Sequence, residues 1–125
     1  MTKAIIICHC QLAFDFFNTL QKLYGKIADI YPFSNDFLAP EVLYNKVADI
    51  IKKHSPSSFI ILVDLRGGNC WKTGKMLSKD FKGIKLISGV NIPMVISYVN
   101  KRNNYTLDEL AEIVEKDSHR GIILE

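Results

Sequence analysis

A histidine stands between two cysteines at the end of the apolar run AIIICHC, and each of the three side chains can do chemistry. Thiolates and imidazole bind zinc, two thiols can form a redox pair, and an imidazole can act as a base or a nucleophile. The group Cys8-His9-Cys10 therefore has three possible uses: a metal site, a redox pair, or a reactive histidine whose sulfur neighbours only pack.

A carboxylate near the middle of the chain is the natural partner for this histidine. Asp64 lies at the end of the apolar run FIILVDL, and the turn RGGN (66–69) follows it. A carboxylate that accepts the proton of one ring nitrogen fixes the tautomer and frees the other nitrogen. Backbone N–H groups in a glycine turn and at helix N-termini bind anions. The pattern favours a site where a phosphoryl group rests on His9.

Strand-like runs alternate with helix-like patterns along the chain, and these elements must position the two residues. The expected strands are 4–8, 27–31, 59–65, 84–88 and a short final one at 121–125. The expected helices are 11–25, one that ends near His54, 71–79, 93–102 and 106–118. The alternation predicts a three-layer α/β fold, with a mostly parallel sheet in the order 2-1-3-4 and helices on both faces. Strands 1 and 3 are neighbours in that order, so His9 and Asp64 can meet at their carboxyl ends.

Metal and redox chemistry are the alternatives for the cysteines. Cys8, Cys10 and Cys70 could join His9 in a zinc site. However, neighbours on a strand point to opposite faces, which separates Cys8 from His9, and the sequence has no CxxC spacing. We therefore expect no metal. A redox-sensitive pair of Cys10 and Cys70 stays an alternative, and small buried thiols are the simplest interpretation.

The composition is that of one globular domain over residues 1–125, with 48% apolar and 23% charged residues. A net charge of +3 is too small to indicate a nucleic-acid partner. No apolar run is long enough to span a membrane, and the start MTKAIIICHC lacks the features of a signal peptide. We expect a cytoplasmic protein without a disulfide framework, because its cysteine count is odd.

Three motifs in order resemble the mannose-type IIA domain of the bacterial phosphoenolpyruvate-dependent sugar phosphotransferase system. AIIICHCQLAFDFFNTL is similar to the family's opening strand, which ends in His-Gly-x-Leu-Ala and leads into a helix. FIILVDLRGGNCW resembles its strand that ends in Asp-Leu-x-Gly-Gly-Ser/Thr-Pro, and KLISGVNIPMV resembles its Val-Ile-Ser-Gly-x-Asn-Leu-Pro-Met. The final segment TLDELAEIVEKDSHRGI is similar to its last helix, so the resemblance covers nearly the whole chain.

The resemblance implies a phosphoryl carrier. His9 falls on the phosphorylated histidine and Asp64 on the aspartate that orients it. The domain would accept phosphate from the small histidine phosphocarrier protein and pass it to a IIB subunit, without a cofactor. The residues expected at the phosphate are Cys10, Arg66, Gly67, Gly68 and Asn69. The resemblance also implies a homodimer that exchanges the C-terminal strand.

Three residues depart from the family motifs at the site. Cys10 stands in place of the glycine after the histidine, Asn69 in place of Ser or Thr, and Cys70 in place of Pro. The Asn69 amide can still donate a hydrogen bond, whereas Cys10 adds bulk where the backbone should approach a phosphate. The alternative is therefore a noncatalytic or weakly phosphorylated regulatory or binding module that retains the IIA fold.

Overall fold

Four parallel strands form one sheet in the order β2-β1-β3-β4 in the computed structural model, which describes residues 1–125. The strands are β1 (Lys3–Cys8), β2 (Ile30–Ser34), β3 (Phe59–Val63) and β4 (Ile84–Ser88). The central pair places Ile7 of β1 opposite Val63 of β3. The predicted strand order and parallel direction are confirmed.

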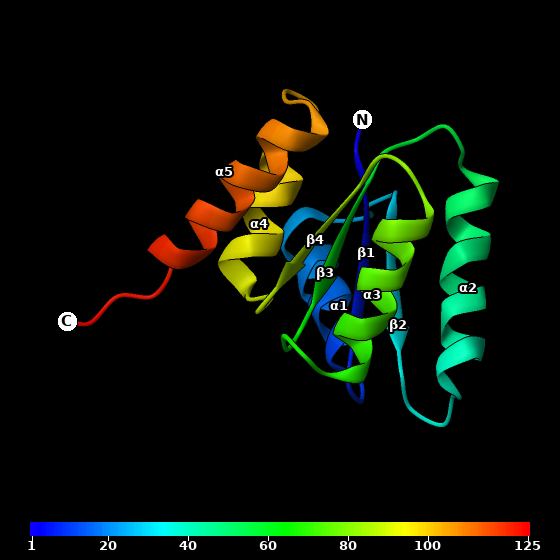
Figure 1. Ribbon diagram of the computed structural model, residues 1–125. Coiled ribbons are helices and arrows are strands. Elements are labelled where there is room, and N and C mark those ends of the chain that lie inside the picture. The colour runs from blue at the N-terminus through cyan, green and yellow to red at the C-terminus, as the bar shows by residue number, and fades with distance from the viewer.

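Five helices cover the two faces of this sheet (Figure 1). They are α1 (Leu12–Tyr24), α2 (Pro40–Lys53), α3 (Asn69–Asp80), α4 (Ile92–Lys101) and α5 (Leu107–Arg120). One apolar core joins the sheet to α1, α4 and α5, and a second joins it to α2 and α3. The three-layer α/β architecture predicted from the sequence is confirmed, and none of the helices has the length and apolar character needed to cross a membrane.

Alternation along β1 explains why its sequence is apolar without interruption. Ala4, Ile6 and Cys8 pack into the core beneath α1, α4 and α5, whereas Ile5 and Ile7 pack into the core beneath α2 and α3. A central parallel strand that is buried on both faces has no polar side to show in its sequence. The same holds for β3, in which every residue is buried.

Several element boundaries differ by two or three residues from the sequence-based expectation; β3, for example, ends at Val63 rather than at residue 65. The second strand lies at Ile30–Ser34 rather than at 27–31, and it includes Pro32. A proline is tolerated there because β2 is an edge strand, where an N–H group is not needed on the outer side. Helix α3 begins at Asn69, two residues earlier than predicted, because the extended Gly68 already acts as its N-cap.

The expected final strand at 121–125 is not present in the single chain. Helix α5 continues to Arg120, and the remaining residues form a turn and an extended tail that points away from the body of the molecule (Figure 1). No strand of this chain pairs with the tail, so its backbone forms no ladder. The exchange of this segment between two chains stays a prediction.

Candidate active site

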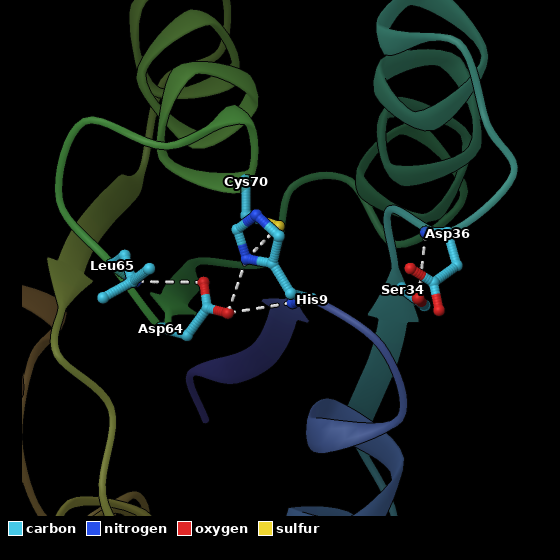
Figure 2. A network of polar contacts seen from close by, with 6 residues as sticks. All are labelled: His9, Ser34, Asp36, Asp64, Leu65 and Cys70. Atoms are coloured by element: carbon cyan, nitrogen blue, oxygen red, sulfur yellow. Dashed lines mark hydrogen bonds and ion pairs between the residues drawn. The ribbon is translucent and has the colours of Figure 1, made fainter.

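His9 and Asp64 lie in hydrogen-bond contact at the carboxyl ends of β1 and β3 (Figure 2). The Asp64 carboxylate accepts from the backbone N–H of His9 at 2.9 Å, and its same oxygen lies 2.8 Å from the ring atom Nδ1. The register pairs Ile7 with Val63, so Asp64 directly follows β3 and His9 directly follows β1 at the same edge of the sheet. The sequence-based expectation that these side chains meet is confirmed.

The carboxylate of Asp64 is held in place from two sides. Its second oxygen accepts the backbone N–H of Leu65 at 2.9 Å, and its side chain is only 9% exposed. Burial works to raise the pKa of Asp64, but the hydrogen bonds from the backbone and ring of His9 and from Leu65 outweigh it and lower that pKa. Asp64 is therefore an ionised acceptor at neutral pH.

An ionised carboxylate decides which nitrogen of His9 carries the proton. Since the carboxylate can only accept, Nδ1 must donate, and in the neutral ring Nε2 then keeps its lone pair. The side chain of His9 is 41% exposed, so a reactant can reach it from solvent. The pair thus presents one free, oriented nucleophilic nitrogen.

The glycine turn brings the start of α3 against the same ring. Gly67 has a φ of +87°, which a residue with a side chain rarely adopts. A Cβ added to Gly68 would lie 3.4 Å from Cε1 of His9 and 4.0 Å from Nε2. Gly68 is the N-cap of α3, and no side chain caps the helix there, so the N–H groups of the first turn remain available to an anion beside Nε2.

The remaining residues expected at the phosphate lie around this core with different surroundings. Cys10 is exposed and has a φ of +54°, in the left-handed region that glycine favours. The guanidinium of Arg66 lies 5.8 Å from the centroid of the Trp71 ring. Asn69, the first residue of α3, lines a groove of about 520 Å³ between α2 and α3.

Cys70, which the sequence suggested as a zinc ligand or as a redox partner of Cys10, lies beside the ring of His9. Its Sγ lies 3.9 Å from Nδ1 of His9, and the residue is fully buried in the first turn of α3 (Figure 2). Burial, and then the charge of Asp64, raise the pKa of the Cys70 thiol to about 12. All three cysteines are free thiols, and Cys8 packs into the core on the α1 side, away from His9, as strand alternation predicts.

Comparisons with known proteins agree with this geometry. The model of the family described as "PTS system fructose IIA component" matches residues 3–115. The chain is 25% identical over 113 residues to the "PTS system sorbose-specific EIIA component" of Klebsiella pneumoniae, across 90% of this chain and 83% of that protein. It is 24% identical over 117 residues to the protein of the same description from Lacticaseibacillus casei, across 91% and 83%.

Solved structures share the fold. A phosphotransferase system component EIIA from Streptococcus agalactiae has a TM-score of 0.92 at 23% identity, covering 99% of this chain and 97% of that one. The mannose/sorbose specific IIA subunit from Enterococcus faecalis has a TM-score of 0.86 at 21% identity, covering 99% and 94%. A sigma-54 interaction domain protein from Enterococcus faecalis has a TM-score of 0.81 at 14% identity, covering 95% and 91%.

Proposed function

Because the chain belongs to the family of PTS fructose IIA components, we propose that it is a phosphoryl-carrier subunit of a sugar phosphotransferase system. His9 accepts the phosphoryl group from a histidine phosphocarrier protein and passes it to a IIB subunit. The observation that carries this proposal is the hydrogen bond from Nδ1 of His9 to Asp64, which leaves Nε2 free beside the uncapped start of α3.

The transfer step uses the free lone pair of the ring. Nε2 of His9 attacks the phosphorus atom of the phosphohistidine on the carrier protein. A bond forms between phosphorus and Nε2, while the bond to the carrier's ring nitrogen breaks and its electron pair stays on that nitrogen. The proton on Nδ1 remains in place, so the His9 ring becomes positively charged next to the carboxylate of Asp64. Transfer to the IIB subunit repeats the exchange with His9 as the donor.

The phosphoryl oxygens require donors on the side of Nε2. The N–H groups in the first turn of α3 and the positive end of that helix lie on this side, because Gly68 packs against the ring. The amide of Asn69 adds a donor where the family motif has a hydroxyl. Arg66 lies in the same turn, and its guanidinium suits phosphate or the phosphorylated partner.

A regulatory or binding module that keeps the fold is the second candidate. The observation that favours it is Cys10, which stands in place of a glycine and has a left-handed backbone. Its side chain narrows the approach of a phosphate to the backbone after His9. The same fold also occurs in the sigma-54 interaction domain protein, although at 14% identity that likeness concerns the fold alone.

Phosphorylation of the purified chain distinguishes the two candidates. We expect one added phosphate in the intact mass after incubation with phosphoenolpyruvate, enzyme I and the phosphocarrier protein. The phosphate should be acid-labile, absent in His9→Ala and present in His119→Ala, which removes an exposed histidine at the far end of α5. An unlabelled chain under conditions that label a known IIA domain would reject the carrier function in favour of the module.

We also propose that two chains form a homodimer in which residues 121–125 of each pair with the sheet of the other. Three observations support this. The outer edge of β4 has no partner strand, and no residue of β4 is fully buried. Ile122, Ile123 and Leu124 are at least 70% exposed in the single chain. An exchanged strand would cover the open edge and the apolar tail together.

A further inference from the structure

Three side chains that can bind a metal converge at the carboxyl end of the sheet. Nδ1 of His9, a carboxylate oxygen of Asp64 and Sγ of Cys70 all lie within 4.8 Å of one another. They come from three separate segments: the end of β1, the end of β3 and the first turn of α3 (Figure 2). The zinc site considered from the sequence combined Cys8, Cys10 and Cys70 with His9. The group in the structure keeps His9 and Cys70, and Asp64 takes the place of Cys8 and Cys10.

The spacing of the three atoms suits one small cation. Zinc binds imidazole nitrogen and carboxylate oxygen at about 2.0–2.2 Å and thiolate at about 2.3 Å, so the donors of a tetrahedral site lie about 3.3–3.7 Å apart. Nδ1 lies 2.8 Å from the Asp64 oxygen and 3.9 Å from Sγ, and all three donors lie within 4.8 Å of one another, so the Asp64 oxygen and Sγ must approach each other. Side-chain shifts of about 1 Å would produce three tetrahedral ligands, and the exposed side of His9 leaves the fourth position to water.

We propose that His9, Asp64 and Cys70 form a binding site for a thiophilic divalent cation, with Zn²⁺ as the best match. The thiolate and the carboxylate supply two negative charges, which balance the charge of the ion in a partly buried place. On binding, the thiol proton of Cys70 leaves to solvent. The proton on Nδ1 of His9 moves to Nε2, since the metal now occupies Nδ1.

Metal binding and phosphorylation exclude each other in this arrangement, a consequence that rests on the proposed carrier function. A neutral imidazole with a metal on Nδ1 carries its proton on Nε2, so the lone pair needed for attack on phosphorus is lost. Asp64 is then a metal ligand and no longer accepts the hydrogen bond that orients the ring. The cysteine at position 70 thereby makes the reactive histidine sensitive to zinc, which the proline of the family motif would not do.

Cobalt spectroscopy tests the site without any phosphorylation. Titration of the reduced, unphosphorylated chain with Co²⁺ should produce visible bands of tetrahedral cobalt and a thiolate-to-cobalt charge-transfer band, all removed by one equivalent of Zn²⁺. Cys70→Ser should lose the charge-transfer band and bind Zn²⁺ on the order of tenfold more weakly or worse. Cys10→Ser, which removes an exposed thiol next to His9, should keep both the band and the affinity.

Folding of each variant is checked by circular dichroism, and Cys70→Ala serves as a second variant at the buried position. No charge-transfer band in the folded wild-type chain would overturn the proposal, as would equal loss of the band in Cys10→Ser. In a separate arm, Zn²⁺ should slow phosphorylation of the wild-type chain but not of Cys70→Ser, each relative to its own rate without zinc. A chain that binds Co²⁺ through Cys70 yet takes no phosphate would reject the carrier function and leave the metal site standing.

Discussion

The two nitrogens of the His9 ring have different surroundings, and Asp64 causes the difference. One nitrogen faces a carboxylate that is itself fixed by two backbone N–H groups, and the other faces the start of α3. A charge-assisted hydrogen bond contributes about 1.5–3 kcal/mol. This hydrogen bond reaches its full strength when the ring becomes charged during transfer. It therefore lowers the activation free energy of transfer more than it stabilises the fold.

The change Asp64→Asn should therefore slow phosphorylation of His9 roughly 10- to 100-fold. An amide can turn its NH₂ toward Nδ1, which selects the wrong tautomer, and it cannot stabilise the cation formed in transfer. The measurement is the initial rate of phosphate incorporation, with circular dichroism to verify the fold. Asp36→Asn removes a charge at the same end of the sheet and should keep the wild-type rate (Figure 2). Equal rates in Asp64→Asn and the wild-type chain would remove Asp64 from the mechanism.

Cys10 has a backbone conformation better suited to the glycine that it replaces. The left-handed region costs a residue with a side chain about 1–2 kcal/mol, whereas glycine enters it freely but gains about 0.4–1 kcal/mol of freedom in the unfolded chain. The thiol is exposed, so removing it costs little packing. Cys10→Gly should have the wild-type free energy of unfolding or exceed it by up to about 1 kcal/mol.

A second substitution of Cys10, one that should destabilise the protein, provides the comparison for the glycine variant. Cys10→Val should lower the free energy of unfolding by about 1 kcal/mol or more, because a β-branched residue tolerates a positive φ poorly. Urea denaturation curves measure both variants. A glycine variant clearly less stable than the valine variant would mean that residue 10 does not keep this backbone in solution.

The meeting of His9 with Asp64 could be predicted because it needs only the strand order and the rule that parallel strands end at one edge. The contact of Cys70 with the ring could not, since it depends on the residue at which α3 begins. Because α3 begins at Asn69 rather than at Trp71, Cys70 belongs to the first turn of the helix and not to the preceding loop. The early N-cap at Gly68 thus decides that the thiol points at the histidine.

Element boundaries were predictable where local chemistry sets them. The pattern TLDE at the start of the last helix forms a full capping box: Thr106 accepts the N–H of Glu109, and the Glu109 carboxylate accepts the N–H of Thr106. The predicted position of the second strand was wrong because the strand includes Pro32. A proline is tolerated in an edge strand, and the position of a strand in the sheet cannot be recognised from its own segment.

Removal of the cap on α5 should be measurable in the whole protein. We expect Thr106→Ala to lower the free energy of unfolding by about 1 kcal/mol, because the first turn of the helix loses an acceptor for its N–H groups. Thr106→Ser keeps the hydroxyl and should retain most of the stability. Urea denaturation with both variants checks this, and an unchanged midpoint for Thr106→Ala would show that the box does not stabilise the helix end.

The open edge of the sheet and the C-terminal tail concern the assembly of the whole molecule. In the single chain, residues 121–125 form no strand and the outer edge of β4 has no partner. The proposed exchange pairs the open edge of β4 in one copy with the exposed apolar tail of the other.

Sedimentation of the full chain and of a chain that ends at Arg120 tests the proposed assembly. We expect a dimer for the full chain at micromolar concentration and a markedly weaker dimer, or a monomer, for the shortened one, because the apolar residues of the tail are lost from the interface. Leu124→Ser in the full chain is an intermediate case that should weaken the dimer without shortening the backbone. A monomeric full chain, or a shortened chain that dimerises equally well, would contradict the exchange.

His9 and Asp64 are 55 residues apart in the sequence, so the ribosome synthesises them at different times. At roughly 5–20 residues per second, the nascent histidine exists for about 3 to 11 s before its carboxylate partner is even synthesised. Cys70 follows only six positions after Asp64. Once α3 has been synthesised to Asp80, the chain contains every residue of the proposed phosphate and metal sites. The remaining third of the chain, which supplies β4 and the helices α4 and α5, is translated after all residues of the site around His9 have been synthesised.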